Sequence, residues 1–215
     1  MYYRFKDSWQ KLMPSIDNCR LNFEVLNALY STPNRFYHNL SHIKMCLDKL
    51  NEYKAFLGQY LSTKDTVDFS HVEFAIWYHD AICLVDDIDN EQASFQLAKQ
   101  VISNNAFANT LNRIEKLIML TKHAPNVVVD VEDINLLTIA DIDLAILGKS
   151  PEIFFEYDAN IRKEYSKYND VYYKQSRIKV LQGFLDRQYI YHINYFREKY
   201  ESQARKNLKD AITKL

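Results

Sequence analysis

Hydrophobic residues recur every three or four positions along most of the chain, which is the spacing of one face of an α-helix. This spacing predicts about nine helices separated by short links. Their expected ranges are Ser15 to Tyr30, Asn39 or Ser41 towards Gly58, Phe69 to Ile82, Asp86 through Val101, Leu111 to Thr121, Ile134 to Leu147, Pro151 through Ile161, Val171 to Leu185, and Ile193 to Leu215.

Several of these boundaries carry local signals. Pro33 should stop the first helix, because proline cannot continue a helix interior. Ser150 followed by Pro151 is a favourable start, with serine as the cap and proline in the first turn. Pro125 and the three valines from Val127 indicate a break, with a short extended piece between two helices.

The composition supports a helical protein. The 215 residues include three glycines and four prolines, whereas average usage would give about 25. A β-rich fold needs many tight turns, so this scarcity argues against one. Sixteen tyrosines, twelve phenylalanines and two tryptophans exclude intrinsic disorder. We therefore predict an all-α fold, a compact multi-helix bundle forming one domain over residues 1–215.

Charge and cysteine usage exclude several function classes. Lys and Arg number 27 against 28 Asp and Glu, so the basic surplus that a nucleic-acid scaffold needs is missing. Cys19, Cys46 and Cys83 lie far apart without a C-x-x-C pair, which argues against a structural zinc site or a disulfide framework. With no signal peptide and no run of 18 apolar residues, we expect a cytoplasmic protein that does not enter membranes. Homo-oligomerisation stays open.

Histidines and carboxylates gather at predicted helix ends. His38 and His42 are four residues apart, which places them on one face if that segment is helical. His79 and Asp80 end a buried apolar helix, and His123 follows Thr121 and Lys122 at another helix end. Asp141 and Asp143 lie inside an apolar helix.

A carboxylate in an apolar helix is costly unless it is paired or bound to a cation. This argument applies to Asp80 and Asp141. Imidazoles and carboxylates that meet in one core suit a divalent metal such as Mn²⁺, Fe²⁺, Ni²⁺, Co²⁺, Zn²⁺ or Mg²⁺. The alternative is a set of packed His–Asp hydrogen bonds without metal.

The ordered set of motifs resembles the HD superfamily of metal-dependent phosphohydrolases, in particular a branch of predicted members without an assigned substrate. The core of the resemblance covers residues of about 35–148, and further matches extend it to Tyr191. Its motifs are Tyr37-His38-Asn39-Leu40-x-His42, Ala75-x-Trp77-x-His79-Asp80, Asn90-Glu91-x-x-Ser94, Thr121-x-His123, Asp141-x-Asp143-Leu144-x-Ile146-Leu147-Gly148, Arg162-x-Glu164-Tyr165 and Arg177-x3-Leu181-x2-Phe184-Leu185.

The resemblance implies a helical bundle that binds metal through His42, His79, Asp80 and Asp141, with Asp80 best placed to bridge two ions. His38 and His123 match positions where some relatives supply further histidines. The adjacent His-His pair of the branch that cleaves cyclic dinucleotides is missing here.

A phosphohydrolase mechanism follows from the expected ion, which would activate water and polarise a phosphoryl oxygen. Arg35, Lys122 and Arg162 are candidate phosphate clamps, with surface charge as the alternative. Glu91 is a candidate to orient a ligand histidine or to activate water, with support of the helix terminus as an equal alternative. Asp143 points in a different direction from Asp141 on a helix, so we expect it either to support the ligand set or to serve in helix packing.

Nucleotides, nucleoside polyphosphates and small phosphomonoesters all fit as substrates. One alternative is a metal-bound sensor or scaffold, with the aromatic C-terminal part as a partner surface. Another is an HD-type di-iron oxygenase, which the additional histidines His38 and His123 keep open.

Overall fold

The computed structural model describes residues 1–13, 18–60, 67–85, 89–102, 108–123 and 132–215. Every regular element among them is helical, which confirms the all-α prediction. The expected helix starts at Ser15 and Asp86 and the break at Pro125 to Val129 lie outside the described residues.

The chain divides into two compact units, Met1–Ile139 and Ala140–Leu215, with the boundary inside helix α7. The single-domain prediction therefore stays a prediction, and the units are described one at a time. The first holds α1 (Tyr2–Leu12), α2 (Cys19–Tyr30), α3 (Leu40–Leu57), α4 (Ser70–Tyr78), α5 (Asn90–Ile102), α6 (Ala108–Leu120) and the start of α7 (Ile134–Asp143). The second holds the rest of α7, the 3₁₀ helix η2 (Leu144–Gly148), α8 (Pro151–Glu164), α9 (Asp170–Leu185) and α10 (Asn194–Lys214).

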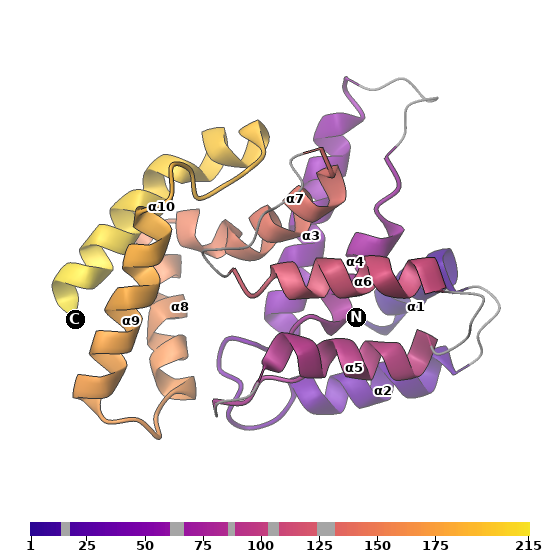
Figure 1. The fold of residues 1–215 in the computed structure, drawn as a ribbon, viewed down its shortest axis with the longest axis horizontal. Helices are drawn as coiled ribbons and strands as arrows, with labels where there is room; N and C mark the ends of the chain where they lie inside the picture. The colour runs from indigo at the N-terminus through magenta and orange to yellow at the C-terminus, as the bar shows by residue number, and fades with distance from the viewer. Residues whose placement is uncertain (14–17, 61–66, 86–88, 103–107, 124–131) are drawn as a thin grey trace. The chain divides into compact units, whose positions relative to one another are not determined.

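Helix α4 is the centre of the first unit. It contacts α1, α3, α5 and α6 (Figure 1), and all its residues except His71 are buried. Trp77 and Phe74 are fully shielded from solvent, and Phe5 of α1 packs edge-on against the Trp77 ring. A helix with apolar residues on most of its sides is stable only inside a core, which is why the other helices surround it.

Helix α1 was not predicted, because we expected no helix before Ser15. Its buried residues Phe5, Trp9 and Leu12 follow the i, i+4, i+7 spacing of a helix face. Lysines, an aspartate and a glutamine between them obscure this short pattern in the sequence. No described helix combines the length and the apolar character needed to cross a bilayer.

In the second unit, the predicted helix Ile134 to Leu147 ends early. The α-helix stops at Asp143 and continues as η2. The buried Asn207 of α10 donates from Nδ2 to the carbonyls of Leu147 and Lys149, both at 2.8 Å. Its side chain thus satisfies backbone carbonyl groups at the end of η2. These bonds hold η2 tightly against α10.

The C-terminal aromatic residues of this unit divide between its core and its surface. Phe154, Tyr173, Tyr191 and Phe196 are buried in the core. Tyr165, Tyr172 and Tyr189 are exposed, and the use of the aromatic part as a partner surface stays a prediction.

Replacing Gly148 by alanine should destabilise the second unit. An added Cβ would lie 2.5 Å from the Cβ of Tyr200 and 2.7 Å from its carbonyl oxygen. Since overpacking of this kind costs about 1–3 kcal/mol, the denaturation midpoint should fall. Gly183→Ala in α9 is the matched control, because nothing lies within 4 Å of its added Cβ. We expect that control to be neutral or slightly stabilising, and equal losses in the two variants would contradict the prediction.

A buried ion-pair network ties α1 and α3 to α4. The Glu73 carboxylate is 6% exposed and accepts from Lys11 Nζ at 3.0 Å and from Lys54 Nζ. Burial alone would raise the pKa of Glu73, but the hydrogen bonds and charges of Lys54 and Lys11 outweigh it and lower the pKa. A depressed carboxyl pKa makes the folded state hold its proton less tightly than the unfolded chain does.

The stabilisation from Glu73 should therefore be complete above the ordinary glutamate pKa of about 4.3 and be lost as the pH falls through the folded value. Glu73→Gln should reduce the free energy of unfolding at pH 7 by about 1–2 kcal/mol, and the difference from wild type should shrink in acid. Urea denaturation across pH 3–7 measures both effects. Glu24→Gln, in an exposed pair with Arg20, is the control and should change little. A loss for Glu73→Gln that does not vary with pH would refute the ionic explanation.

Candidate metal centre

Helix α4 ends inside the protein, so its last carbonyl groups need internal donors. All four have one. The donors are the backbone N–H of His79 for Ala75 (2.9 Å), the Nδ1 of His79 for Ile76 (3.0 Å), the hydroxyl of Tyr30 for Trp77 (3.0 Å), and the backbone N–H of Ala81 for Tyr78 (3.0 Å). This complete set of partners fixes the position of the His79-Asp80 pair.

Arg35 supports the same turn. Its guanidinium donates to the carbonyls of His38 (3.0 Å), Ala81 (2.7 Å) and Asp80, and it lies over the ring of Tyr30. These three contacts use Arg35 to hold the backbone of this turn. Its role as a phosphate clamp stays a prediction.

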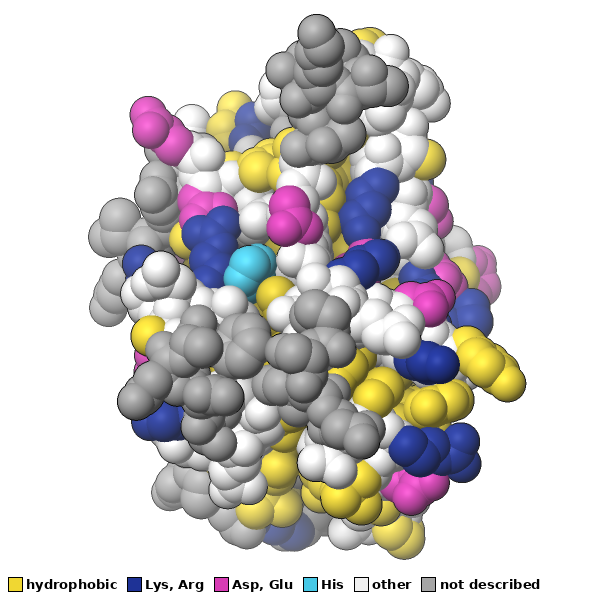
Figure 2. Space-filling model, turned by 90° about the vertical axis from the view of Figure 1, so that its right-hand side faces the viewer, with side chains coloured by type: hydrophobic (Ala, Val, Ile, Leu, Met, Phe, Trp, Pro, Cys, Tyr) yellow, Lys and Arg dark blue, Asp and Glu magenta, His cyan; other side chains and the backbone are white. Residues whose placement is uncertain are grey.

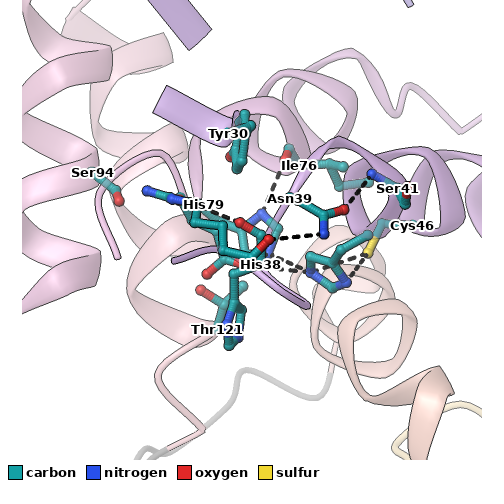
Figure 3. Close-up of polar contacts among 12 residues, drawn as sticks. Tyr30, His38, Asn39, Ser41, Cys46, Ile76, His79, Ser94 and Thr121 are labelled. Carbon is teal, nitrogen blue, oxygen red and sulfur yellow. Dashed lines mark hydrogen bonds and ion pairs between the residues drawn. The ribbon is translucent and has the colours of Figure 1, made fainter. Parts of the chain in front are cut away.

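Three predicted ligands of the first unit converge at the end of α4. The Nε2 atoms of His42 and His79 are 3.2 Å apart, and Asp80 Oδ2 lies 3.3 Å from the first and 3.0 Å from the second. His42 and His79 are buried, while the Asp80 side chain is 20% exposed. We call these three side chains the triad. Figure 3 shows His79 bonded to Ile76, with the polar groups of neighbouring segments around it.

Electrostatics favour the charged form of Asp80. Burial alone would raise the pKa of this carboxyl group. The charges of His79 and His38, with the hydrogen bonds from His42 and His79, outweigh that effect and hold the pKa well below its usual range. The triad therefore contains an ionised carboxylate.

The tautomer of His79 is set by its second nitrogen. Because Nδ1 lies 3.0 Å from the carbonyl oxygen of Ile76, we assign a proton to Nδ1, so Nε2 is the nitrogen that can give up its proton to bind a metal. This Nε2 faces the Nε2 of His42 and the oxygen of Asp80. Histidines that bind metals commonly donate their other ring N–H to a backbone carbonyl in this way.

The donor set fits a divalent cation. Neighbouring ligands of an octahedral ion with bonds of about 2.1 Å lie about 3 Å apart. The three distances in the triad, 3.0 to 3.3 Å, match that spacing. Two imidazoles and one carboxylate, with side chains that reach solvent only at Asp80, can hold one ion and leave coordination positions for water and a ligand.

Two further predicted residues lie in the first unit near this end of α4. Burial raises the pKa of Glu91, and the charges of Asp80 and Asp89 raise it further, so Glu91 is an electrostatic neighbour of the triad. Lys122 is bound to Asp89 at 2.6 Å, and both side chains are about 40% exposed. An exposed pair of this kind can exchange partners, so Lys122 remains available to an anion.

The other predicted histidines are only partly buried. His38 lies just before α3, and its ring centre is 6.1 Å from that of His42. His123 follows α6 with a left-handed backbone, at φ of 50°. Cys46, which we did not predict near the site, places its Sγ 3.7 Å from His42 Nε2 and 3.8 Å from Nδ1 (Figure 3). Its i+4 spacing from His42 was the sequence signal for that contact.

Asp141 belongs to the second unit and has other partners there. Its fully buried carboxylate accepts from the backbone N–H groups of His192 (2.8 Å) and Ile193 (2.7 Å) and lies 2.9 Å from His192 Nδ1. Counting the second contact from the His192 N–H, these bonds use about four acceptor positions, which is all that a carboxylate offers. Within this unit Asp141 therefore anchors the turn before α10. Its role as a fourth metal ligand stays a prediction.

The two remaining candidates are also in the second unit. Asp143 is the half-buried last residue of α7. Arg162, predicted as a phosphate clamp, binds Asp170 at 2.7 Å and donates to the carbonyls of Tyr165 and Tyr168. These contacts give its guanidinium a role in joining α8 to α9.

Comparisons of the chain with protein-family models, with curated proteins and with solved structures found no match. The all-helical fold and the His/Asp triad are compatible with an HD fold. The likeness to that superfamily therefore rests on the motif residues.

Ser94 of α5 supports the segment after the triad, and its replacement should lower the free energy of unfolding. The fully buried hydroxyl accepts from the Ile82 N–H (3.0 Å) and donates to the Ile82 carbonyl (3.2 Å). Ser94→Ala leaves both backbone groups without this partner, so we expect a loss of about 1–3 kcal/mol in unfolding free energy. The exposed Ser202→Ala is the control and should be nearly neutral. Equal stability of the two variants would show that Ile82 does not depend on Ser94.

Proposed function

We propose that the chain is a divalent-metal-dependent phosphohydrolase that acts on a small phosphate ester or a nucleotide. The observation that carries the proposal is the triad, in which His42, His79 and Asp80 direct two imidazole nitrogens and one carboxylate oxygen to a common point. The motif resemblance described above supports the same reaction class.

A divalent ion held by the triad would supply hydroxide near neutral pH and neutralise charge on a phosphoryl oxygen. The protein residues orient the reactants. His79 is fixed through Ile76, and Asp80 is fixed through its backbone carbonyl by Arg35. Such prior positioning is the main contribution that phosphoryl transfer requires of a protein.

Glu91 and Lys122 complete the proposed reaction. Glu91 is half-buried and near Asp80, so it can accept a proton from the attacking water. Lys122 can leave Asp89 for a phosphate oxygen, which carries more negative charge. Asp141 and Asp143 are not needed for this minimal site and remain predicted additions to it.

An oxygen-activating iron enzyme is the second candidate. Two histidines and one carboxylate with open positions are the ligand set of non-haem Fe²⁺ oxygenases, and the triad has that composition. Oxygen consumption by protein reconstituted with Fe²⁺ separates this candidate from a hydrolase. A metal-bound sensor or scaffold would show neither activity.

The proposal predicts metal-dependent hydrolysis that Asp80→Ala abolishes. Protein purified without a histidine tag should contain a divalent metal, and chelator should remove its activity against a broad library of phosphate esters and anhydrides. Asp80→Ala removes the only negative ligand of the triad, so both metal content and turnover should be lost. The measurements are elemental analysis and phosphate release.

Asp7→Ala is the matched control, since Asp7 is an exposed carboxylate on α1 in the same unit. It should retain the metal and the activity. Full activity in Asp80→Ala would contradict the proposal. Absence of activity in metal-loaded wild type would favour the sensor, and oxygen uptake would favour the oxygenase.

A further inference from the structure

The turn that joins α8 to α9, at the lower left of Figure 1, carries a stack of three tyrosine rings. The ring centres of Tyr165 and Tyr168 are 6.3 Å apart with 26° between the ring planes, and those of Tyr168 and Tyr172 are 5.0 Å apart with 29°. Tyr172 is the outer member of the stack, and 54% of it is exposed. The stack therefore ends in a ring that Tyr168 supports and that is more than half open to solvent.

Hydrogen bonds hold the backbone that carries this stack. Arg162 donates to the carbonyls of Tyr165 at 2.9 Å and Tyr168 at 3.1 Å. The side chain of Asn169 accepts from the N–H of Tyr172 at 2.9 Å and so caps α9 directly after the turn. Because the tyrosines are already ordered, a ligand that stacks on Tyr172 does not have to order them when it binds.

The charge around the stack is positive, although the whole chain is nearly balanced. The second unit has 14 Lys and Arg against 11 Asp and Glu, whereas the first has 13 against 17. The surplus gathers in the segment from Arg162 to Lys179, which has six basic and two acidic residues. Of these two, Glu164 is buried and Asp170 binds Arg162. A balanced charge over the whole chain therefore does not exclude the binding of an anion at this segment.

Four exposed lysines belong to the segment of the stack, namely Lys163, Lys167, Lys174 and Lys179. The Nζ of Lys167 lies 5.0 Å from the centre of the Tyr168 ring. Lys179 follows Tyr172 by seven residues, which places both on one face of α9, about 10 Å apart along its axis. An open aromatic ring with cations beside it suits a ligand that combines a planar ring with negative charge.

A nucleotide in a single strand has this combination, because its base has a face for stacking and its phosphate is an anion. We infer that the α8–α9 turn is a platform for single-stranded nucleic acid, on which one base stacks on Tyr172 and the neighbouring phosphates contact the exposed lysines. A proline-rich peptide also docks on aromatic rings, but it has no charge to match the lysines. The inference uses no residue of the triad and does not rest on the proposed function.

Exposed aromatic residues elsewhere on the protein have different surroundings. Figure 2 shows a face on which hydrophobic side chains lie among basic and acidic side chains, and such mixed charge indicates no particular ligand. Tyr3 on α1 is 80% exposed, and its ring is tilted by 55° from that of Tyr2. Tyr3 thus has the exposure of Tyr172 without the parallel stack, which makes it the matched control.

The test measures how the full chain binds fluorescent single-stranded oligonucleotides of about ten residues, followed by anisotropy. A chelator is present throughout, so that no metal-dependent hydrolysis can destroy the probe. DNA and RNA of the same base sequence should both bind, with an affinity that falls as the salt concentration rises. Tyr172→Ala should weaken binding about tenfold, whereas Tyr172→Phe keeps the ring and should bind like wild type. A probe made of abasic residues should bind more weakly and should not respond to Tyr172→Ala.

Charge is tested separately from stacking. Lys179→Gln should weaken the binding of every probe and reduce its dependence on salt, because one phosphate contact is lost. Lys116→Gln, at an exposed position of α6 in the first unit, is the control and should change neither quantity. Tyr3→Ala should also leave the affinity unchanged. Circular dichroism verifies that each variant folds.

Absence of oligonucleotide binding by wild type at low salt would overturn the inference. An equal affinity of wild type and Tyr172→Ala would overturn it too, as would a loss in Tyr3→Ala as large as that in Tyr172→Ala. Binding of an uncharged proline-rich peptide that depends on Tyr172, without binding of oligonucleotides, would assign the platform to a protein partner instead. The phosphohydrolase proposal is unaffected by these outcomes, because its own test requires bound metal and these measurements exclude it.

Discussion

The candidate site depends on one constraint, the burial of the C-terminal end of α4. A helix that ends in a core exposes four carbonyl groups to a medium without water, and each unsatisfied group would cost about 1–3 kcal/mol. The chain satisfies them with His79 itself, with Tyr30 from α2 and with the following turn. Because the ring of His79 takes one of these carbonyls through Nδ1, its Nε2 must point the other way, towards His42 and Asp80. The need to satisfy the backbone thus orients the nitrogen that could bind a metal.

The turn beyond α4 is supported by side chains that do not touch the triad's common point. Arg35 holds carbonyl groups on the two segments that carry His38 and Asp80, and Ser94 holds both backbone groups of Ile82. A guanidinium can do this because it offers several donors in a fixed plane. Hydrogen bonds of this kind fix the backbone of a short irregular segment, and with it the positions of the side chains that the segment carries.

The sequence was sufficient for the fold class and for part of the site, for physical reasons that can be traced to particular residues. His79 and Asp80 stood out because polar groups directly after a fully apolar run must find partners, and those partners include His42. Tyr30 and Ser94 could not be assigned in this way, because hydrogen bonds to distant backbone carbonyls leave no periodic signal. The 3₁₀ turn at Leu144–Gly148 was missed since it depends on Asn207 of α10. The carbonyl oxygens that Arg35 and Arg162 contact could not be predicted either, because a sequence shows a charge but not its partners.

Asp80 and Asp141, two carboxylates that the resemblance assigns to one ligand set, are stabilised in opposite ways. Asp141 accepts backbone N–H groups of His192 and Ile193, donors that cannot be removed by changing protonation. Asp80 faces imidazole nitrogens, each of which can give up its proton and become a ligand. A cation that approaches Asp80 displaces protons, whereas one that approaches Asp141 must displace backbone hydrogen bonds. Exchanging a proton for a metal leaves the fold unchanged, while breaking the bonds of Asp141 would release the turn that leads into α10. On this physical ground the end of α4 is the favoured place for a metal within the described residues.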